Sequence, residues 1–178
     1  MAISFIAVLI VVSIAAFLDI RTHRIPNWLT YSACALGLLL AAAAAGFNGL
    51  LNSLAGFAAA FIPLLLMFIG GSVGGGDVKL MGAVGALLGF PAGLNALISS
   101  ILVGGFCAAI ILLWQGRLFP ILRRAASVAW SKVYPLHVPY AAPPDHKDSF
   151  PFGAAIAVGT WLTVISIQLG MKTPAHLF

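Results

Sequence analysis

Long apolar runs separated by short polar breaks dominate this chain. Their rich Leu, Ala, Ile and Gly content and the lack of alternating polar positions favour helices over strands. Each run is roughly 16–22 residues long, which is close to the length that a helix needs to cross a membrane. The runs cover residues 2–18, 29–46, 51–69, 78–93, 95–115 and 152–170. We therefore predict an all-α, polytopic membrane protein with about six transmembrane helices in a single domain, residues 1–178.

The composition supports this prediction. Hydrophobic residues make up 62% of the chain and charged residues 7%, and the mean hydropathy is +1.10. A soluble domain of this size cannot bury that much apolar surface. The first run is a poor signal peptide because no positive charge precedes it and Arg21 and Arg24 follow it.

Basic residues predict the orientation. If the amino terminus lies outside the cell, eight of the nine Lys and Arg residues face the cytoplasm and only Lys172 lies outside. This satisfies the positive-inside rule, and the opposite orientation violates it. Both acidic residues at run ends, Asp19 and Asp77, then lie on the cytoplasmic side.

One sizeable polar segment, residues 116–149, separates the last two runs. Its first half has apolar residues at helical spacing, with Arg123 and Arg124 on the other face. It is read either as a basic helix on the inner leaflet or as an ordinary solvated loop helix. The sequence leaves both interpretations open.

Two aspartates stand where an apolar environment makes a charge costly. The chain has four acidic residues; Asp145 and Asp148 lie in the polar segment, whereas Asp19 and Asp77 lie at the ends of apolar runs. Such residues are functional candidates by default. Two carboxyls that meet and share a proton are the chemistry of an aspartic hydrolase. The plainer interpretation of Asp19 is a surface pair with a nearby arginine at a helix end.

Asp77 closes a glycine cluster, residues 74–76. The cluster matches neither a phosphate-binding loop, which needs Lys and Ser or Thr after its last glycine, nor a dinucleotide fingerprint. It is either a flexible connector or a place where a substrate backbone approaches closely. Gly85 and Gly89 form a small-residue stripe, which we expect to pack the fourth run against the first. Cys34 and Cys107 stand alone, so we expect neither a metal site nor a cofactor.

Three elements together resemble the prepilin peptidases, membrane aspartic proteases with a GxGD motif. They are "DIRTHRIPN" after the first run, "GGGDVKLMGAVGALLG" opening the fourth and "PFGAAIAVG" opening the last. The resemblance implies that Asp19 and Asp77 form the catalytic pair. It also implies that the remaining motif or substrate-binding residues are Gly74, Gly76, Lys79, Pro151 and Gly153. Lys79 either balances charge or extends its amine toward the membrane surface.

The resemblance also implies the biological setting. The substrate would be a prepilin or pseudopilin with a short basic leader, cut at the cytoplasmic face of a bacterial inner membrane. Membrane lipid would be a partner and nucleic acid would not; the oligomeric state is not indicated. Longer members carry a methyltransferase insert after the first span. About ten residues stand there in this chain, so it resembles the short type found with tight-adherence (Flp) pilus systems.

Two alternatives belong to other classes. A small transporter or accessory subunit would use Asp19 and Asp77 as a proton or cation relay, which requires acids near the membrane midplane. A scaffold of a pilus or secretion complex would need neither aspartate.

Overall fold

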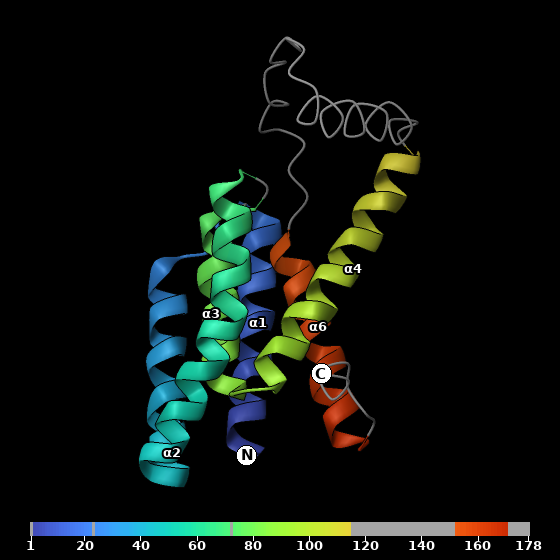
Figure 1. Ribbon diagram of the computed structural model, residues 1–178. Coiled ribbons are helices and arrows are strands. Elements are labelled where there is room, and N and C mark those ends of the chain that lie inside the picture. The colour runs from blue at the N-terminus through green and yellow to red at the C-terminus, as the bar shows by residue number, and fades with distance from the viewer. Residues whose placement is uncertain (1, 23, 72, 115–151, 171–178) are drawn as a thin grey trace, which may run out of the picture. The chain divides into compact units, whose positions relative to one another are not determined.

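Helices account for every regular element that the structure describes. The computed structural model describes residues 2–22, 24–71, 73–114 and 152–170, and its arrangement is drawn in Figure 1. The helices are α1 (Ala2–Thr22), α2 (Asn27–Ile69), α3 (Gly75–Leu88), α4 (Ala92–Trp114) and α6 (Phe152–Gln168). The all-α prediction is confirmed for these ranges. The segment 116–149 and Pro151 lie outside the described residues.

Fewer membrane-spanning helices are identified in the described residues than the six that we predicted for the whole chain. Within those residues, three helices are long and apolar enough to cross a membrane: Ile3–Thr22, Asn27–Ile69 and Ala92–Trp114. Helix α3 has 14 residues and α6 has 17. At 1.5 Å per residue, α3 is about 21 Å long, which is less than the hydrocarbon thickness of about 30 Å. The prediction of about six transmembrane helices is therefore not confirmed.

Helix α2 folds back on itself. We predicted two runs, 29–46 and 51–69, with a connector between them. Instead, the non-helical backbone is confined to Ala45 (φ −141°, ψ 20°) and Gly46 (φ 58°, ψ −138°). A positive φ suits glycine, which has no side chain to clash. The two arms, 27–44 and 47–69, run in opposite directions (Figure 1). The reversal was predicted correctly, but the length of its connector was not.

Helix α3 is the most deeply buried helix of the described chain. Residues 80–87 are all buried, and both arms of α2 pack against them through glycines. A Cβ atom on Gly37 would lie 2.8 Å from the carbonyl carbon of Ala86. A Cβ atom on Gly56, in the second arm, would collide with the backbone of Gly85. These contacts bring backbone against backbone, so they leave no room for a side chain.

The small-residue stripe of α3 therefore has a different partner from the one we predicted. Gly85 meets Gly56 and Gly89 meets Asn52, and both partners belong to the second arm of α2. The expectation that this stripe packs against α1 was wrong. Helix α1 contacts α3 and α6, and it contributes larger side chains, Val8 and Val12, to the buried core.

Helix α6 joins the bundle through small and hydroxyl-bearing residues. Gly159 lies against the backbone of Ser100 in α4. The Thr163 hydroxyl donates to the Ser99 hydroxyl at 3.2 Å, and the Trp161 ring nitrogen donates to the Ser13 hydroxyl at 3.3 Å. These interactions hold α6 beside α1 and α4.

The outer faces of the helices are strongly apolar. Large hydrophobic side chains stand exposed along α1, α2 and α6. Examples are Ile3, Ile6, Ile10, Leu39, Phe47, Leu66, Leu162 and Ile165. Such surfaces are costly in water and favourable in lipid. Together with the three long apolar helices, they indicate an integral membrane protein.

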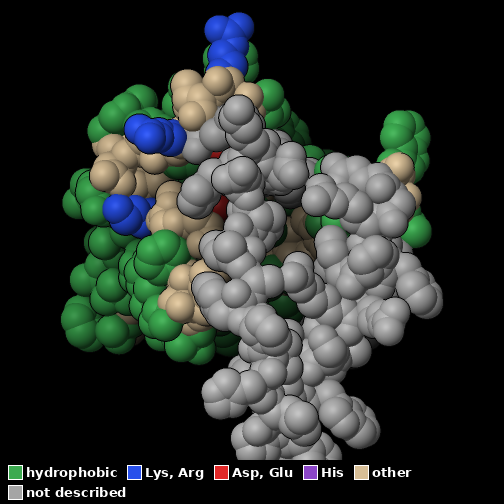
Figure 2. Space-filling model, turned by 90° about the horizontal axis from the view of Figure 1, so that it is seen from above, with side chains coloured by type: hydrophobic (Ala, Val, Ile, Leu, Met, Phe, Trp, Pro, Cys, Tyr) green, Lys and Arg blue, Asp and Glu red, His purple; other side chains and the backbone are tan. Residues whose placement is uncertain are grey.

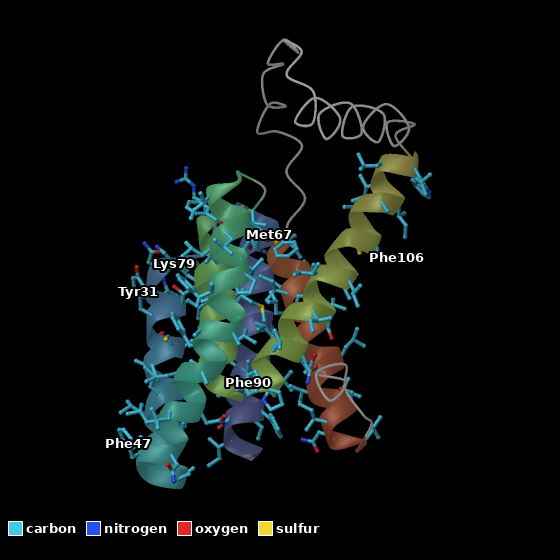
Figure 3. All side chains as sticks on the ribbon, in the orientation of Figure 1. Tyr31, Phe47, Met67, Lys79, Phe90 and Phe106 are labelled. Atoms are coloured by element: carbon cyan, nitrogen blue, oxygen red, sulfur yellow. The ribbon has the colours of Figure 1, made fainter. Side chains whose placement is uncertain are left out.

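The described residues divide into two units. One comprises Met1–Gly104 with Pro151–Phe178, and the other comprises Gly105–Phe150. In the second unit the structure describes only the apolar end of α4, Gly105–Trp114, where Phe106 is exposed (Figure 3). All of the residues of the candidate site belong to the first unit.

Candidate active site

Three helix ends meet at one end of the first unit. Helix α1 ends there, and α3 and α6 begin there (Figure 1). Asp19 lies in the last turn of α1 and Asp77 in the first turn of α3. Pro26, with an extended backbone (φ −69°, ψ 139°), precedes α2, and Gly74, also extended, precedes α3. Each carboxyl group therefore lies close to a helix end, where the backbone becomes non-helical.

Asp19 is held inside the protein by the start of α6. Its side chain is 7% exposed, and one carboxylate oxygen, Oδ2, accepts a hydrogen bond of 2.9 Å from the backbone N–H of Gly153. Gly153 is the second residue of α6, where backbone N–H groups have no partner within the helix. The Arg21 guanidinium lies 4.5 Å from the centre of the Phe17 ring. Burial distinguishes Asp19 from the surface pair that was its plainer interpretation.

Asp77 is half-buried and lies outside the three helices that are long enough to span a membrane. Burial raises the pKa of the Asp77 carboxyl to about 7, and the charge of Asp19 contributes in the same direction. A backbone hydrogen bond with Gly74 opposes the shift. The effect of Asp19 means that the two carboxyls are near enough to influence each other's ionisation. The ionisation of Asp77 therefore depends on the charge of Asp19.

Acidic side chains are scarce in the described residues. Asp19 and Asp77 are the only acidic residues in the described part of the chain. Figure 2, seen from above, shows small areas of acidic side chain, with Lys and Arg side chains farther out on one side.

The three glycines before Asp77 have different neighbours. Gly74 is exposed, and a Cβ atom there would lie 3.1 Å from Asp77 Oδ2. A Cβ atom on Gly75 would lie 3.4 Å from the Phe68 ring, and one on Gly76 would lie 3.2 Å from Cβ of Ile25. Gly76 thus faces the connector between α1 and α2. Of the three, the position best suited to an approaching substrate backbone is Gly74.

Lys79 has partners that sequence reasoning did not identify. Its amine donates to Asn27 Oδ1 at 2.9 Å and lies 5.4 Å from the centre of the Tyr31 ring. Figure 3 shows Lys79 and Tyr31 side by side. The amine therefore ties α3 to the first turn of α2, on the side of α3 that faces α2.

The structure brings together most of the residues that the resemblance selected. Asp19, Asp77, Gly74, Gly76 and Gly153 lie at one end of the first unit, and Lys79 points toward α2. In the described ranges no group of three His, Cys, Asp or Glu side chains is placed to hold a metal ion. Sequence reasoning missed the contact of the Gly153 N–H with Asp19 and the packing of Ile25 against Gly76. The only sequence signal for the first was a helix start of ordinary composition.

These features define a class: a helical integral membrane protein with two interacting carboxyls at one end of the bundle. The sequence model of the type IV leader peptidase family matches residues 6–109, more than half of the 178 residues, and the chain belongs to that family. The prepilin leader peptidase/N-methyltransferase of Bacillus subtilis (strain 168) is 34% identical to it over 122 residues. This alignment covers 66% of this chain and 46% of that protein, so the chain spans about half the length of its curated relative. No solved structure matches the chain significantly.

Proposed function

We propose that this chain is an aspartic endopeptidase that removes the short basic leader from prepilins or pseudopilins. The observation that carries the proposal is the interaction of Asp19 and Asp77, which come from different helices and lie at the same end of the bundle. Family membership supports the same reaction. The printed name of the curated relative, a prepilin leader peptidase, supports the substrate class.

The proposed chemistry needs both carboxyls in different protonation states. An ionised carboxylate takes a proton from water as the water attacks the scissile carbonyl carbon. A protonated carboxyl donates a hydrogen bond to the carbonyl oxygen and stabilises the charge that develops there. The proton then passes to the leaving amine and the peptide bond breaks. A pair that shares one proton near neutral pH supplies both groups, and the proposal requires no metal or cofactor.

We propose that the aspartates face the cytoplasm and that the amino terminus lies outside. Arg21, Arg24 and Lys79 belong to the same end of the unit as the aspartates, and basic residues favour the cytoplasmic side. The substrate's apolar segment would lie in lipid against the helices, with its cleavage site at the membrane edge. In a background without Cys34 and Cys107, labelling of Thr22→Cys from outside intact cells would overturn this orientation.

We propose leader cleavage without methyl transfer. Helix α1 ends at Thr22 and α2 begins at Asn27, and this connector has no room for an inserted domain. The short type associated with tight-adherence pili fits this arrangement. A proton relay is less well supported, because Asp19 and Asp77 lie at helix ends and a relay needs acids near the midplane.

The test uses the full chain in lipid nanodiscs with a synthetic peptide that carries a basic leader before an apolar segment. We expect cleavage at one bond, unaffected by EDTA. Asp19→Asn and Asp77→Asn should each reduce kcat by about 1,000-fold or more, because asparagine can neither ionise nor share a proton. Gly105→Ala is the control, since its added Cβ meets nothing within 4 Å. Near-normal cleavage by either Asn variant, or loss on chelation that zinc restores, would reject the proposal.

A further inference from the structure

The Asp19 carboxylate and the first turn of α6 are built to fit each other. Gly153 N–H donates to Asp19 Oδ2 at 2.9 Å, across 134 residues of sequence. A Cβ atom at position 153 would lie 2.7 Å from Oδ2, 3.0 Å from Cγ and 3.1 Å from Cβ of Asp19. All three nearest atoms belong to this one side chain. The missing side chain of Gly153 is therefore what allows the carboxylate to reach the N–H.

The donor in this contact suits an ionised carboxylate. An N–H group can only donate, so it stabilises an acceptor, and an ionised carboxylate is the stronger acceptor. The positive end of the α6 helix dipole acts in the same direction. Asp19 is buried, and this hydrogen bond holds one of its carboxylate oxygens against the start of α6.

The charged groups around the contact are few in the described residues. Asp77 is the ionisable group of α3 that interacts with Asp19. Lys79 is bound to Asn27, the Arg21 guanidinium lies on Phe17, and Arg24 is exposed. Helix α6 has no ionisable side chain. Its contribution to Asp19 therefore comes from the backbone.

We propose that Gly153 is a positioning residue whose backbone N–H holds Asp19 as the ionised general base, which leaves Asp77 as the partner that carries the proton. The inference rests on the proposed peptidase function and deepens it. Asp77 suits the second role because its pKa of about 7 leaves it protonated in a large share of molecules at neutral pH. Water would lose its proton to Asp19, while Asp77 would donate to the scissile carbonyl oxygen.

Gly153→Ala tests the positioning role directly. The added methyl group displaces the Asp19 carboxylate from its hydrogen bond. We expect kcat to fall by about 100-fold with KM little changed, because a misplaced catalytic group affects the transition state more than substrate binding. Gly159→Ala is the matched control. It makes the same substitution in the same helix, and its Cβ collides with Ser100 rather than with an aspartate.

The control should differ from Gly153→Ala in its kcat. Gly159→Ala should lower the melting temperature while the folded fraction keeps its kcat. A Gly153→Ala enzyme with normal kcat, or with the same pattern as Gly159→Ala, would overturn the positioning role. If both Asn variants are inactive and Gly153→Ala is fully active, this inference fails while the peptidase function stands.

A double-mutant cycle of melting temperatures tests the contact between Gly153 and Asp19 without any activity measurement. Gly153→Ala should lower the melting temperature of the unaltered chain, and it should lower that of Asp19→Ala less, because the alanine removes Oδ2 and Cγ, the two atoms nearest to the new methyl group. Equal decreases in both backgrounds would show that the two residues are not coupled. This result decides the contact even if the chosen peptide is not cleaved.

The residual activities of the Asn variants test the assignment of roles. An asparagine side chain can donate a hydrogen bond, as a protonated carboxyl does, but it cannot accept a proton from water. Asp77→Asn should therefore retain more activity than Asp19→Asn, by about tenfold. The reverse order would assign the base to Asp77 and refute the proposal.

Discussion

The two aspartates are positioned in different ways. Asp77 begins α3, a helix enclosed by both arms of α2 through backbone contacts at Gly37, Gly56 and Gly85. Asp19 ends α1, and its carboxylate accepts a hydrogen bond from the backbone N–H of Gly153. The Asp77 carboxyl is thus placed by the packing of a whole helix, whereas a local backbone contact contributes to the placement of the Asp19 carboxyl.

Because of this difference, substitutions near Asp77 should mainly affect the stability of the fold, and substitutions near Asp19 should mainly affect catalysis. Backbone packing extends over several turns, so a change that disturbs it should unfold the helix pair. A single hydrogen bond to a carboxylate contributes little to the total stability of the bundle but determines where that carboxylate lies. Substitutions around Asp77 and substitutions around Asp19 should therefore have different effects.

The largest effect should come from breaking the Asp77 side with Gly85→Val. The new side chain would overlap the carbonyl of Gly56, with no flexible neighbour to move away. Overpacking of this kind typically costs about 1–3 kcal/mol, and a β-branched side chain lies at the high end of that range. We expect little folded protein and a much lower melting temperature, measured by size-exclusion chromatography and thermal unfolding.

Gly105→Val is the matched control for that change. It places the same side chain at a glycine of α4 whose Cβ would meet nothing within 4 Å. It carries the same helix-propensity penalty, so it isolates the contribution of packing. Equal melting temperatures for the two variants would refute the backbone-packing account of α3.

The next effect, on activity, follows from the pKa of Asp77. Burial, together with the charge of Asp19, raises that pKa to about 7. A raised pKa means that Asp77 holds its proton below about pH 7 and loses it above. If the protonated form is required, kcat/KM should fall roughly tenfold per pH unit above that midpoint. Peptide cleavage measured from pH 6 to pH 9 checks this, and a flat profile across the range would contradict the shared-proton pair.

The smallest effect should come from Lys79→Met, which unties α3 from the start of α2. The substitution removes the hydrogen bond to Asn27 and the contact with the Tyr31 ring. We expect a loss of about 1 kcal/mol in stability and only a small decrease in kcat. Lys79→Gln retains a donor for Asn27 and should be intermediate. A normal melting temperature with abolished cleavage would instead place Lys79 in the catalytic machinery.

Much of the fold was predictable because membrane helices leave strong sequence signals. Apolar runs predicted the helices, and the cost of a charge beside lipid selected Asp19 and Asp77 as candidates. The reversal of α2 was predicted, but its tightness was not, because the positive φ that confines it to Ala45 and Gly46 is a property of the backbone. A glycine stripe indicates that another helix packs closely against that face of α3. It does not indicate which helix this is, and in this protein α2 rather than α1 packs there.

The other contacts of the site could not be predicted, because they also depend on the backbone and on how separate helices meet. Gly153 acts through an N–H group that nearly every residue possesses, so its role has no signature in residue type. Its distance from Asp19 in sequence removes any local pattern as well. The positions of Gly76 against Ile25 and of Lys79 against Asn27 also depend on how separate helices meet.

The long sequence separation between Asp19 and Gly153 also has a consequence during biosynthesis. A ribosome adds about 5–20 residues per second, so the donor emerges roughly 7–27 s after the carboxylate it serves, because 134 residues separate them. Both aspartates are present on the nascent chain for the later part of this interval, once residue 77 has been added, in helices that are made before α6. Under the role proposed for Gly153, the growing polypeptide carries its reactive groups without the arrangement that activates them. Hydrolysis would then begin only after α6 has been inserted, which delays the onset of proteolysis until the bundle is assembled.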